Sequence, residues 1–284
     1  MTPSAEEASS LPMAAADVLT DTAAPDFARR FGGLERLYGV AGAARIRHAH
    51  VLVVGIGGVG SWAVEALARS GVGRLTLIDL DHVSESNINR QIHALDSTVG
   101  QAKVEAMRER IAQINPDCQV LAIDEFVEPD NWASLLETAQ AAHGPVHAVI
   151  DACDQVKAKL AMAAWARTVS RSTAFITVGA AGGKRQAHKV DIDDLSLVTH
   201  DPLLAQLRQR LRKLHGAPRE GRKIGLACVF SRESVAPPDA SCQIDAGDGS
   251  LNCHGYGSVV SVTATFGQCA AGWVLDEIAR NTTL

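Results

Sequence analysis

The sequence predicts an α/β fold with a largely parallel sheet and helices on both of its faces. Two observations support this class. Short runs of β-branched and apolar residues alternate with segments of helical periodicity between residues 51 and 178, and a glycine-rich turn joins the first run to the helix after it. No internal repeat interrupts the chain of 284 residues, and its 46% hydrophobic content is enough for the core of one large domain.

The regular elements can be placed in chain order. Five short apolar runs predict strands over residues 51–54, 75–78, 119–123, 146–150 and 174–178. Four segments with apolar residues at helical spacing predict helices over residues 61–70, 101–114, 132–142 and 157–170. Because helices separate successive strands, most of the strands are expected to run parallel.

The alternation lapses after Gly179. A glycine-rich loop and one more strand are expected next. A basic helix then begins after Asp201, which can cap it, with Pro202 at the first helical position. Residues 216–257 are expected to be rich in loops, and the sequence leaves the conformation of residues 225–257 open. A final buried helix should cover residues 258–280.

One domain accounts for most of the chain. Residues 1–25 are rich in Ala, Ser, Pro and acids, and are expected to form a disordered tail. Residues 26–284 should form the domain, with residues 191–257 as an insertion before the final helix. Residues 249–275 carry no charged side chain and are long enough to span a membrane, but their many polar residues favour a buried helix.

Composition excludes several classes of protein. The net charge of −5 argues against general binding to DNA, so any contact with nucleic acid must come from a local basic patch. The six cysteines include no C-x-x-C pair, which favours reduced thiols in the cytoplasm over a disulfide framework or a four-cysteine zinc site. No basic cluster precedes Arg29, so a signal peptide is not expected.

The glycine-rich turn is the first candidate site. Its glycines let the backbone approach a phosphate closely, and the helix that follows offers free N–H groups at its N-terminus. These glycines are Gly55, Gly57, Gly58 and Gly60. Asp79 ends the next strand, where a carboxylate can accept hydrogen bonds from a ribose. Asp81 follows closely and could cap the next loop or approach a metal ion. The turn and Asp79 predict a nucleotide site of Rossmann type.

The residues after this turn favour chemistry on phosphates. Asn87, Arg90, Gln91 and Lys103 follow the ribose carboxylate on a loop and the helix beyond it. A dehydrogenase does not split its cofactor and has little need of positive charge over the phosphates. An enzyme that transfers AMP must neutralise a pyrophosphate leaving group, for which arginine and lysine are suited.

Two carboxylates follow the fourth predicted strand. Asp151 and Asp154 stand where open α/β sheets place their binding sites, at the carboxyl ends of the strands. Together they could hold the Mg²⁺ that accompanies ATP. A helix cap and a turn acid are the structural alternative.

In combination, these motifs resemble a known superfamily. The segments GIGGVG, DLDHVSESNINRQ, GQAKVEAM and DACD are similar to those of adenylating enzymes of the ubiquitin-activating superfamily, which includes the bacterial thiamine and molybdopterin activators. The resemblance implies transfer of AMP from ATP to a carboxylate. By this resemblance Asp79 binds ribose, Asn87, Arg90 and Lys103 act on the phosphates, and Asp154 supports Mg²⁺. The zinc-binding cysteines of many members are absent, so no structural zinc is expected.

The flanking segments narrow the resemblance. RFGGLERLYG, RQIHAL, QINPDCQV, HDPLLAQLRQRLRK and CVFSRE resemble the tRNA threonylcarbamoyladenosine dehydratase family, from about Ala28 to Ala279. The resemblance implies a homodimer that adenylates the threonyl carboxylate of the modified adenosine at position 37 of tRNA. Ring closure then removes one water. Relatives place an arginine across the dimer on the partner's ATP, and here Arg30 or Arg36 is the candidate.

The resemblance also assigns a role to the basic helix. Seven basic residues cluster there and just beyond it, and they are expected to contact tRNA phosphates in a salt-sensitive manner: Arg208, Arg210, Arg212, Lys213, Arg219, Arg222 and Lys223. Residues 191–257 would then face the tRNA or the second subunit. A stripe of leucines should pack the helix inward: Leu203, Leu204, Leu207, Leu211 and Leu214. A solvated amphipathic helix is the structural alternative.

Other functions remain as alternatives. A nicotinamide-dependent oxidoreductase explains only the glycine turn and Asp79, and a nucleotide sensor has no need of Arg90 with Lys103. An adenylyltransferase that activates the C-terminus of a sulfur-carrier protein is the alternative within the adenylating class. The sequence leaves open a thioester at Cys228, Cys242 or Cys253, a bound monovalent cation, and a sulfur acceptor or cysteine desulfurase as partner.

Overall fold

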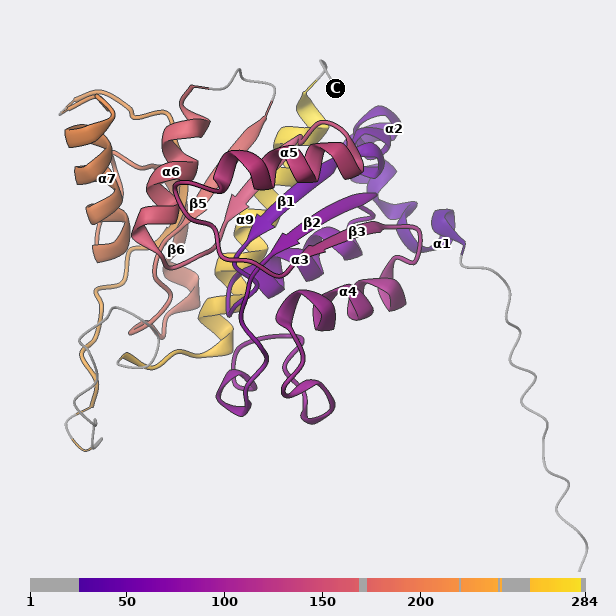
Figure 1. The fold of residues 1–284 in the computed structure, drawn as a ribbon, viewed down its shortest axis with the longest axis horizontal. Helices are drawn as coiled ribbons and strands as arrows, with labels where there is room; N and C mark the ends of the chain where they lie inside the picture. Colours follow the sequence, from indigo (N-terminus) through magenta and orange to yellow (C-terminus); the bar gives the residue numbers. More distant parts are fainter. Residues whose placement is uncertain (1–25, 169–172, 220, 240, 242–255, 282–284) are drawn as a thin grey trace, which may run out of the picture.

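The fold is a seven-stranded sheet between two layers of helices (Figure 1). The computed structural model describes residues 26–168, 173–219, 221–239, 241 and 256–281. The expected tail over residues 1–25 lies outside the described residues. The strand order is β3-β2-β1-β4-β5-β7-β6, and every neighbouring pair is parallel except β6 with β7. The predicted α/β class and the largely parallel sheet are confirmed.

The elements keep the expected order. The strands are β1 (His50–Val54), β2 (Arg74–Ile78), β3 (Gln119–Ile123), β4 (Ala148–Asp151), β5 (Ala174–Val178), β6 (Val190–Asp194) and β7 (Ala227–Ser231). The α-helices are α1 (Phe27–Phe31), α2 (Gly33–His48), α3 (Gly60–Arg69), α4 (Lys103–Ile114), α5 (Trp132–His143), α6 (Val156–Ala166), α7 (Pro202–Leu214) and α9 (Val260–Arg280). Short 3₁₀ turns are η1 (Glu85–Asn87), η2 (Asp96–Thr98) and η3 (Ala187–Lys189). The predicted boundaries agree to within a few residues.

Each face of the sheet has its own hydrophobic cluster. Buried side chains of α2, α3, α4 and α9 cover one face, while α5, α6 and α7 cover the other. Strand β1 lies in the middle and is buried along its whole length. Because apolar burial on both faces holds the central strands, the loops at their carboxyl ends project from a rigid base.

Strand β7 lies in the segment that was expected to be rich in loops and whose conformation the sequence leaves open. It inserts between β5 and β6, parallel to the first and antiparallel to the second. The five residues Ala227–Ser231 have glycines before them and prolines after them, so their periodicity is too short to stand out. Their tertiary setting, buried between two strands, decides their conformation. Strands β6 and β7 thus complete the main sheet.

Helix α9 packs across the sheet and against the start of α3. A side chain at Gly267 would place its Cβ 2.4 Å from the carbonyl oxygen of Val59, so only glycine allows this approach. Phe266, Ala270 and Val274 are fully buried in the same interface. The expected buried helix is therefore confirmed. None of the described helices is long and apolar enough to cross a bilayer.

The predicted leucine stripe on α7 is wrong at one of its five positions. Leu203, Leu204, Leu207 and Leu211 are buried as expected, but the side chain of Leu214 is 61% exposed. Helix α7 ends at Leu214, and the chain turns away at His215. The end of the helix therefore extends past the layer that buries the other four leucines.

A buried histidine at the start of β1 links this strand to β2 and to the carboxyl end of α5. The Nε2 atom of His50 lies 2.8 Å from the hydroxyl of Thr76 on β2, and its Nδ1 lies 3.0 Å from the carbonyl oxygen of Gly144. The ring is fully buried. Burial, with smaller contributions from the neighbouring His143 and Arg74, lowers the pKa of His50 from 6.5 to about 4.

We expect the free energy of unfolding to fall as the pH is lowered toward 4. Unfolded His50 takes up a proton near its ordinary pKa, whereas folded His50 resists protonation until about pH 4. The contribution of neutral His50 to the free energy of unfolding is therefore fully present above pH 6.5 and is lost below it. The loss amounts to about 2 kcal/mol between about pH 8 and pH 5. Urea titrations of the natural protein and of His50→Gln should show a shallower pH dependence in the variant. Equal slopes would contradict the assignment to His50.

Candidate active site at the carboxyl edge of the sheet

The glycine turn after β1 packs against the loop after β4. Gly55 has φ of +85°, and a side chain there would place its Cβ 2.8 Å from the backbone nitrogen of Cys153. A Cβ at Gly60 would lie 1.7 Å from the carbonyl oxygen of Gly55, whereas one at Gly57 would meet nothing within 4 Å. The turn is therefore closed on its inner side and open at Gly57. Val59 provides no side-chain cap to α3, which suits a helix that receives a phosphate.

Asp79 fixes the turn from the neighbouring strand. One carboxylate oxygen accepts a hydrogen bond from the N–H of Ile56 at 2.5 Å, and the other accepts one from the N–H of Asp81 at 2.8 Å. The side chain is almost wholly buried. Burial raises the pKa of Asp79, and the charge of Lys103 and the two N–H donors oppose this rise. The predicted ribose ligand thus stands directly beside the glycine turn.

Lys103 and Asp81 form an ion pair close to Asp79. The distance from Nζ to Oδ2 is 2.7 Å, with the lysine side chain 7% exposed and the aspartate 55% exposed. Lys103 is the first residue of α4, and its N–H donates to the carbonyl oxygen of Asp81. Both predicted residues therefore lie at the same edge, and the pair holds the ammonium group close to Asp79.

Arg90 lies over the glycine turn. A Cβ at Gly58 would lie 3.4 Å from its Cγ, and its carbonyl oxygen accepts a hydrogen bond from Nε1 of Trp62 on α3. Its guanidinium donates to the carbonyl oxygen of Ser86 and to Oδ1 of Asn89, both exposed contacts that a ligand could replace. The arginine is thus fixed at its backbone and movable at its charged end.

Asn87 and Gln91 are buried residues of the loop that carries Arg90. Oδ1 of Asn87 accepts a hydrogen bond from the N–H of Ser84 in a capping box around η1, and the side chain is buried. Gln91 is also buried, and its Oε1 has no hydrogen-bond partner among the described residues. Direct contact of either with a nucleotide stays a prediction.

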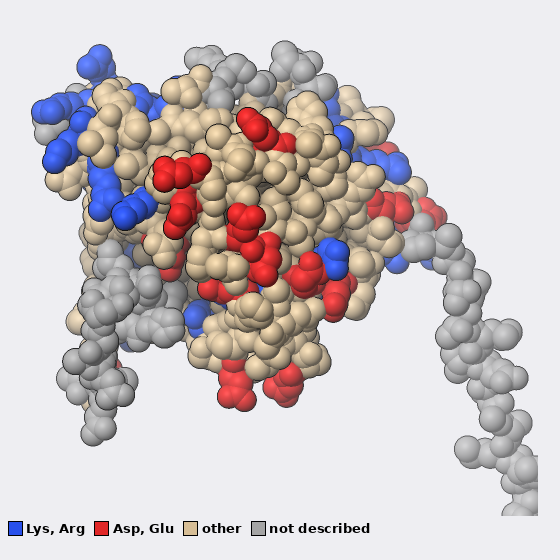
Figure 2. Space-filling view, viewed as in Figure 1, with Lys and Arg blue, Asp and Glu red and all other residues tan. Residues whose placement is uncertain are grey.

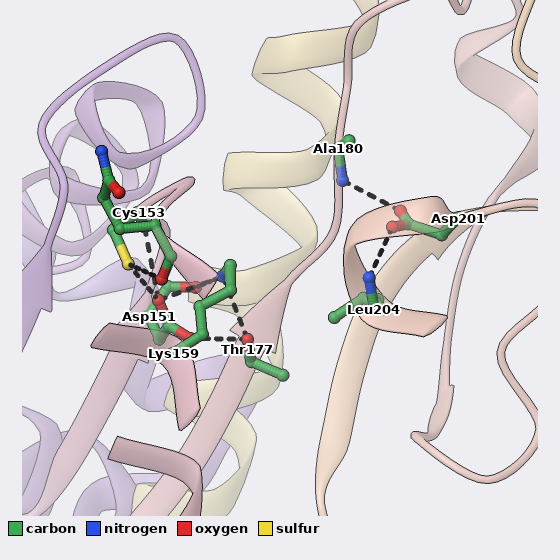
Figure 3. A network of polar contacts seen from close by, with 8 residues as sticks. Asp151, Cys153, Lys159, Thr177, Ala180, Asp201 and Leu204 are labelled. Carbon is green, nitrogen blue, oxygen red and sulfur yellow. Dashed lines mark hydrogen bonds and ion pairs between the residues drawn. The ribbon is translucent and has the colours of Figure 1, made fainter. Parts of the chain in front are cut away.

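Asp151 is the centre of a buried polar network (Figure 3). Its side chain accepts hydrogen bonds from Nζ of Lys159 at 3.1 Å, from the hydroxyl of Thr177 at 2.6 Å and from the N–H of Cys153 at 3.3 Å. Asp151, Lys159 and Thr177 are all fully buried. Burial opposes the charge on Lys159, but the carboxylate outweighs it and raises the pKa of the lysine. Contact of Asp151 with Mg²⁺ would require this network to open.

Asp154 presents its carboxylate to solvent. It is exposed at the start of the connection to α6, and no hydrogen bond or ion pair engages its side chain within the described part of the chain. The DACD loop therefore combines one internal carboxylate with one that is free. Elsewhere in the described structure, no group of three or more His, Cys, Asp or Glu residues is placed to hold a metal ion.

The two candidate arginines of the N-terminal helices do not join this group. Arg30 donates from Nη1 to the carbonyl oxygen of Ile114 at 2.8 Å, at the C-terminal end of α4, whereas Lys103 begins that helix. Arg36 is exposed on α2. Neither reaches the carboxyl edge of its own subunit, and action across a dimer stays a prediction.

The basic helix is anchored beside the site by Asp201. Its carboxylate accepts hydrogen bonds from the N–H of Ala180, after β5, and from the N–H of Leu204, in the first turn of α7, both at 2.9 Å (Figure 3). A Cβ at Gly179 would lie 2.0 Å from this carboxylate. The predicted cap and the start of the helix at Pro202 are confirmed.

The basic side chains of this region divide into two groups. Arg208 donates to the carbonyl oxygens of Leu195 and Val198, and Arg212 donates to that of Pro218, so these two hold the local fold. The other five make no such bonds to the described part of the chain, and four of them are exposed while Arg210 is half-buried: Arg210, Lys213, Arg219, Arg222 and Lys223. Figure 2 shows basic side chains gathered over the part of the molecule that α7 occupies in Figure 1.

Three contributors to the site were missed by the sequence analysis. Lys159 is the one lysine among small and apolar residues on the buried face of α6, which is a weak signal of a buried ion pair. Thr263 of α9 donates from its hydroxyl to the carbonyl oxygen of Arg90 at 3.4 Å. Neither Thr177 nor Thr263 carried a signal in the sequence, because their contacts depend on strand pairing and on the packing of α9. Cys228 is fully buried in β7, which does not suit a thioester, while Cys242 and Cys253 lie outside the described residues.

Known proteins resemble this chain in sequence and in fold. The chain matches the ThiF family over residues 29–281. A tRNA threonylcarbamoyladenosine dehydratase of Escherichia coli (strain K12) is 43% identical, over 88% of this chain and 93% of the relative. One of Haemophilus influenzae is 42% identical, over 90% and 95%. The solved structure of the E. coli tRNA N6-threonylcarbamoyladenosine dehydratase in complex with ATP has a TM-score of 0.77, with 43% identity and 88% and 94% coverage.

We expect Lys159→Met to lower the free energy of unfolding by about 3–5 kcal/mol, because the charge of Asp151 would stay buried without a partner. Urea unfolding should also show that the double variant Asp151→Asn, Lys159→Met recovers much of this loss. Lys157→Met is the matched control on the exposed face of α6, with an expected change within about 0.5 kcal/mol. A loss below 1 kcal/mol for Lys159→Met would contradict the importance of the pair.

Proposed function

This chain belongs to the ThiF family, and we propose that it catalyses the ATP-dependent dehydration of threonylcarbamoyladenosine at position 37 of tRNA to its cyclic form. The observation that carries the proposal is the grouping of the glycine turn, Asp79, Arg90 and Lys103 at one edge of the sheet. The similarity to dehydratases along nearly their whole length supports the substrate. The enzyme would be a carboxylate-adenylating ligase.

ATP would bind across the carboxyl ends of β1 and β2. Asp79 would accept hydrogen bonds from the ribose hydroxyls, and the open turn at Gly57 would receive the phosphates. Arg90 can exchange its exposed contacts for phosphate oxygens, and Lys103 adds a second positive charge next to Asp79. These two cations would stabilise the pyrophosphate as it leaves.

The exposed carboxylate of Asp154 suits Mg²⁺. This ion is commonly held by one or two carboxylates together with substrate phosphates, and Asp154 offers an exposed carboxylate without a partner in the described part of the chain. Bound there, the ion would neutralise part of the phosphate charge. Asp151 would act indirectly, through the N–H of Cys153, by holding the loop that carries Asp154.

The reaction balances in two steps. First, an oxygen of the threonyl carboxylate attacks the α-phosphorus of ATP, and the bond from that phosphorus to pyrophosphate breaks. Second, a nucleophilic atom of the same substrate attacks the activated carbonyl carbon, loses its proton, and displaces AMP with the bonding electron pair. The nucleophile belongs to the substrate and is already at high effective concentration, so the scheme needs no enzyme thiol.

The assembly and the cellular setting follow from the same proposal. The substrate would be tRNA, bound partly by the exposed basic residues at and beyond α7. The protein would act in the cytoplasm as a homodimer, in which Arg30 or Arg36 reaches the ATP of the second subunit. Any sulfur-relay partner would be additional to this activity.

Incubation of threonylcarbamoyl-modified tRNA with the protein and MgATP should remove one water from the modified nucleoside. Mass spectrometry after mild digestion measures this loss, which should require ATP. Arg90→Ala should lower the rate by about 10²–10³-fold, because it removes charge stabilisation from the leaving pyrophosphate. Arg108→Ala is a matched control, since Arg108 lies at the surface of α4 and, among the described residues, pairs with Glu105 alone.

An unchanged nucleoside would contradict the tRNA assignment. If ATP–pyrophosphate exchange still occurred with another carboxylate, adenylation would stand, and activation of a sulfur-carrier protein would become the leading function. Reduction of a nicotinamide cofactor without pyrophosphate exchange would overturn adenylation itself.

A further inference from the structure

A tryptophan holds the loop that carries Arg90 to the helix after the glycine turn. Trp62 lies in the first turn of α3, and its ring N–H donates to the carbonyl oxygen of Arg90 at 2.9 Å. The backbone N–H of Arg90 donates to the carbonyl oxygen of Asn87 at 3.0 Å. Both backbone polar groups of Arg90 are therefore engaged, one within its own loop and one on α3.

Helix α9 contacts the same point. A Cβ at Gly58 would lie 3.4 Å from the methyl group of Thr263 and 3.4 Å from Cγ of Arg90. The hydroxyl of Thr263 lies 3.4 Å from the carbonyl oxygen of Arg90 and 3.3 Å from that of Val260, so its one proton is shared between two acceptors. Trp62 therefore provides the shorter hydrogen bond to Arg90, and the only one of the two whose donor is not shared.

The charged end of Arg90 has no comparable anchor. Its guanidinium donates to the carbonyl oxygen of Ser86 and to Oδ1 of Asn89, both at exposed positions, and must leave them to reach phosphate oxygens. A side chain that exchanges its partners keeps its direction only if its backbone stays in place. Displacement of a reacting group by about 1 Å can lower a rate by about 100-fold. The hydrogen bond from Trp62 is therefore placed to matter for the reaction as well as for the fold.

We propose that Trp62 is a positioning residue for adenylation, which keeps Arg90 directed at the phosphates of ATP by holding its carbonyl oxygen. The proposal rests on the proposed function, and it names a residue that acts through the arginine. The contribution of Trp62 belongs to the transition state, because Arg90 stabilises charge as pyrophosphate leaves. Binding of ATP changes little without it, since Asp79 and the glycine turn still hold the nucleotide.

The kinetics of AMP release from MgATP and modified tRNA test this role. Trp62→Phe keeps an aromatic ring but removes the N–H donor, and it should lower kcat by about three- to tenfold, the effect of one lost hydrogen bond. The KM for ATP should stay within about twofold, because loss of a transition-state interaction lowers kcat and kcat/KM together. Trp273→Phe is the matched control and should keep the natural kcat. Trp273 is a half-buried residue of α9, and no hydrogen bond engages its ring N–H among the described residues.

A second replacement separates the donor from the shape of the ring. Benzothienylalanine at position 62 carries sulfur in place of the ring N–H and keeps the two fused rings. It should lower kcat as much as Trp62→Phe does, while its thermal unfolding matches that of the natural protein.

A double-variant cycle tests whether Trp62 acts through Arg90. In the Arg90→Ala background, Trp62→Phe should lower kcat no further. An equal loss in both backgrounds, or a natural kcat with both replacements of Trp62, would overturn this proposal alone, since adenylation would still proceed. A higher KM for ATP at an unchanged kcat would also overturn it and assign Trp62 to ATP binding. A natural protein that releases no AMP with modified tRNA would overturn the proposed function as well.

Discussion

The buried ion pair of Lys159 and Asp151 is the interaction on which the candidate site depends. Both side chains are fully buried, so neither charge can be hydrated and each requires the other. Because Asp151 ends β4, Thr177 lies on β5 and Lys159 lies on α6, one carboxylate ties two strands to a helix. The same carboxylate holds the N–H of Cys153 and thus directs the following Asp154 outward.

Further contacts extend this constraint across the carboxyl edge. Gly55 packs against the backbone at Cys153, and Gly267 of α9 packs against the carbonyl oxygen of Val59, so the turn is enclosed from two sides. Asp201 ties the basic helix to the end of β5. The glycine turn, the loop that carries the exposed Asp154, and the basic helix are therefore held in one frame. Mobility is left to the exposed ends of Arg90 and of the basic side chains.

The sequence predicts the strands and the glycine turn better than it predicts the hydrogen bonds and ion pairs between elements. Apolar periodicity placed five strands, and glycine spacing located the turn, because both depend on local backbone conformation. The role of Asp151 was harder to predict, since its partners Lys159 and Thr177 come from elements that only the tertiary fold brings together. Strand β7 was missed for the same reason. Exposure at Leu214 depends on where the neighbouring layer ends, which periodicity alone does not reveal.

The central claim is that the substrate carboxylate is activated by transfer of AMP, and oxygen labelling tests it most directly. The experiment uses modified tRNA whose threonyl carboxylate carries ¹⁸O at both oxygens, together with unlabelled MgATP. Adenylation predicts one ¹⁸O atom in the AMP released with each cyclised nucleoside, because the carboxylate oxygen bonded to phosphorus leaves with it. Unlabelled AMP, or ¹⁸O in inorganic phosphate released together with ADP, would contradict the account.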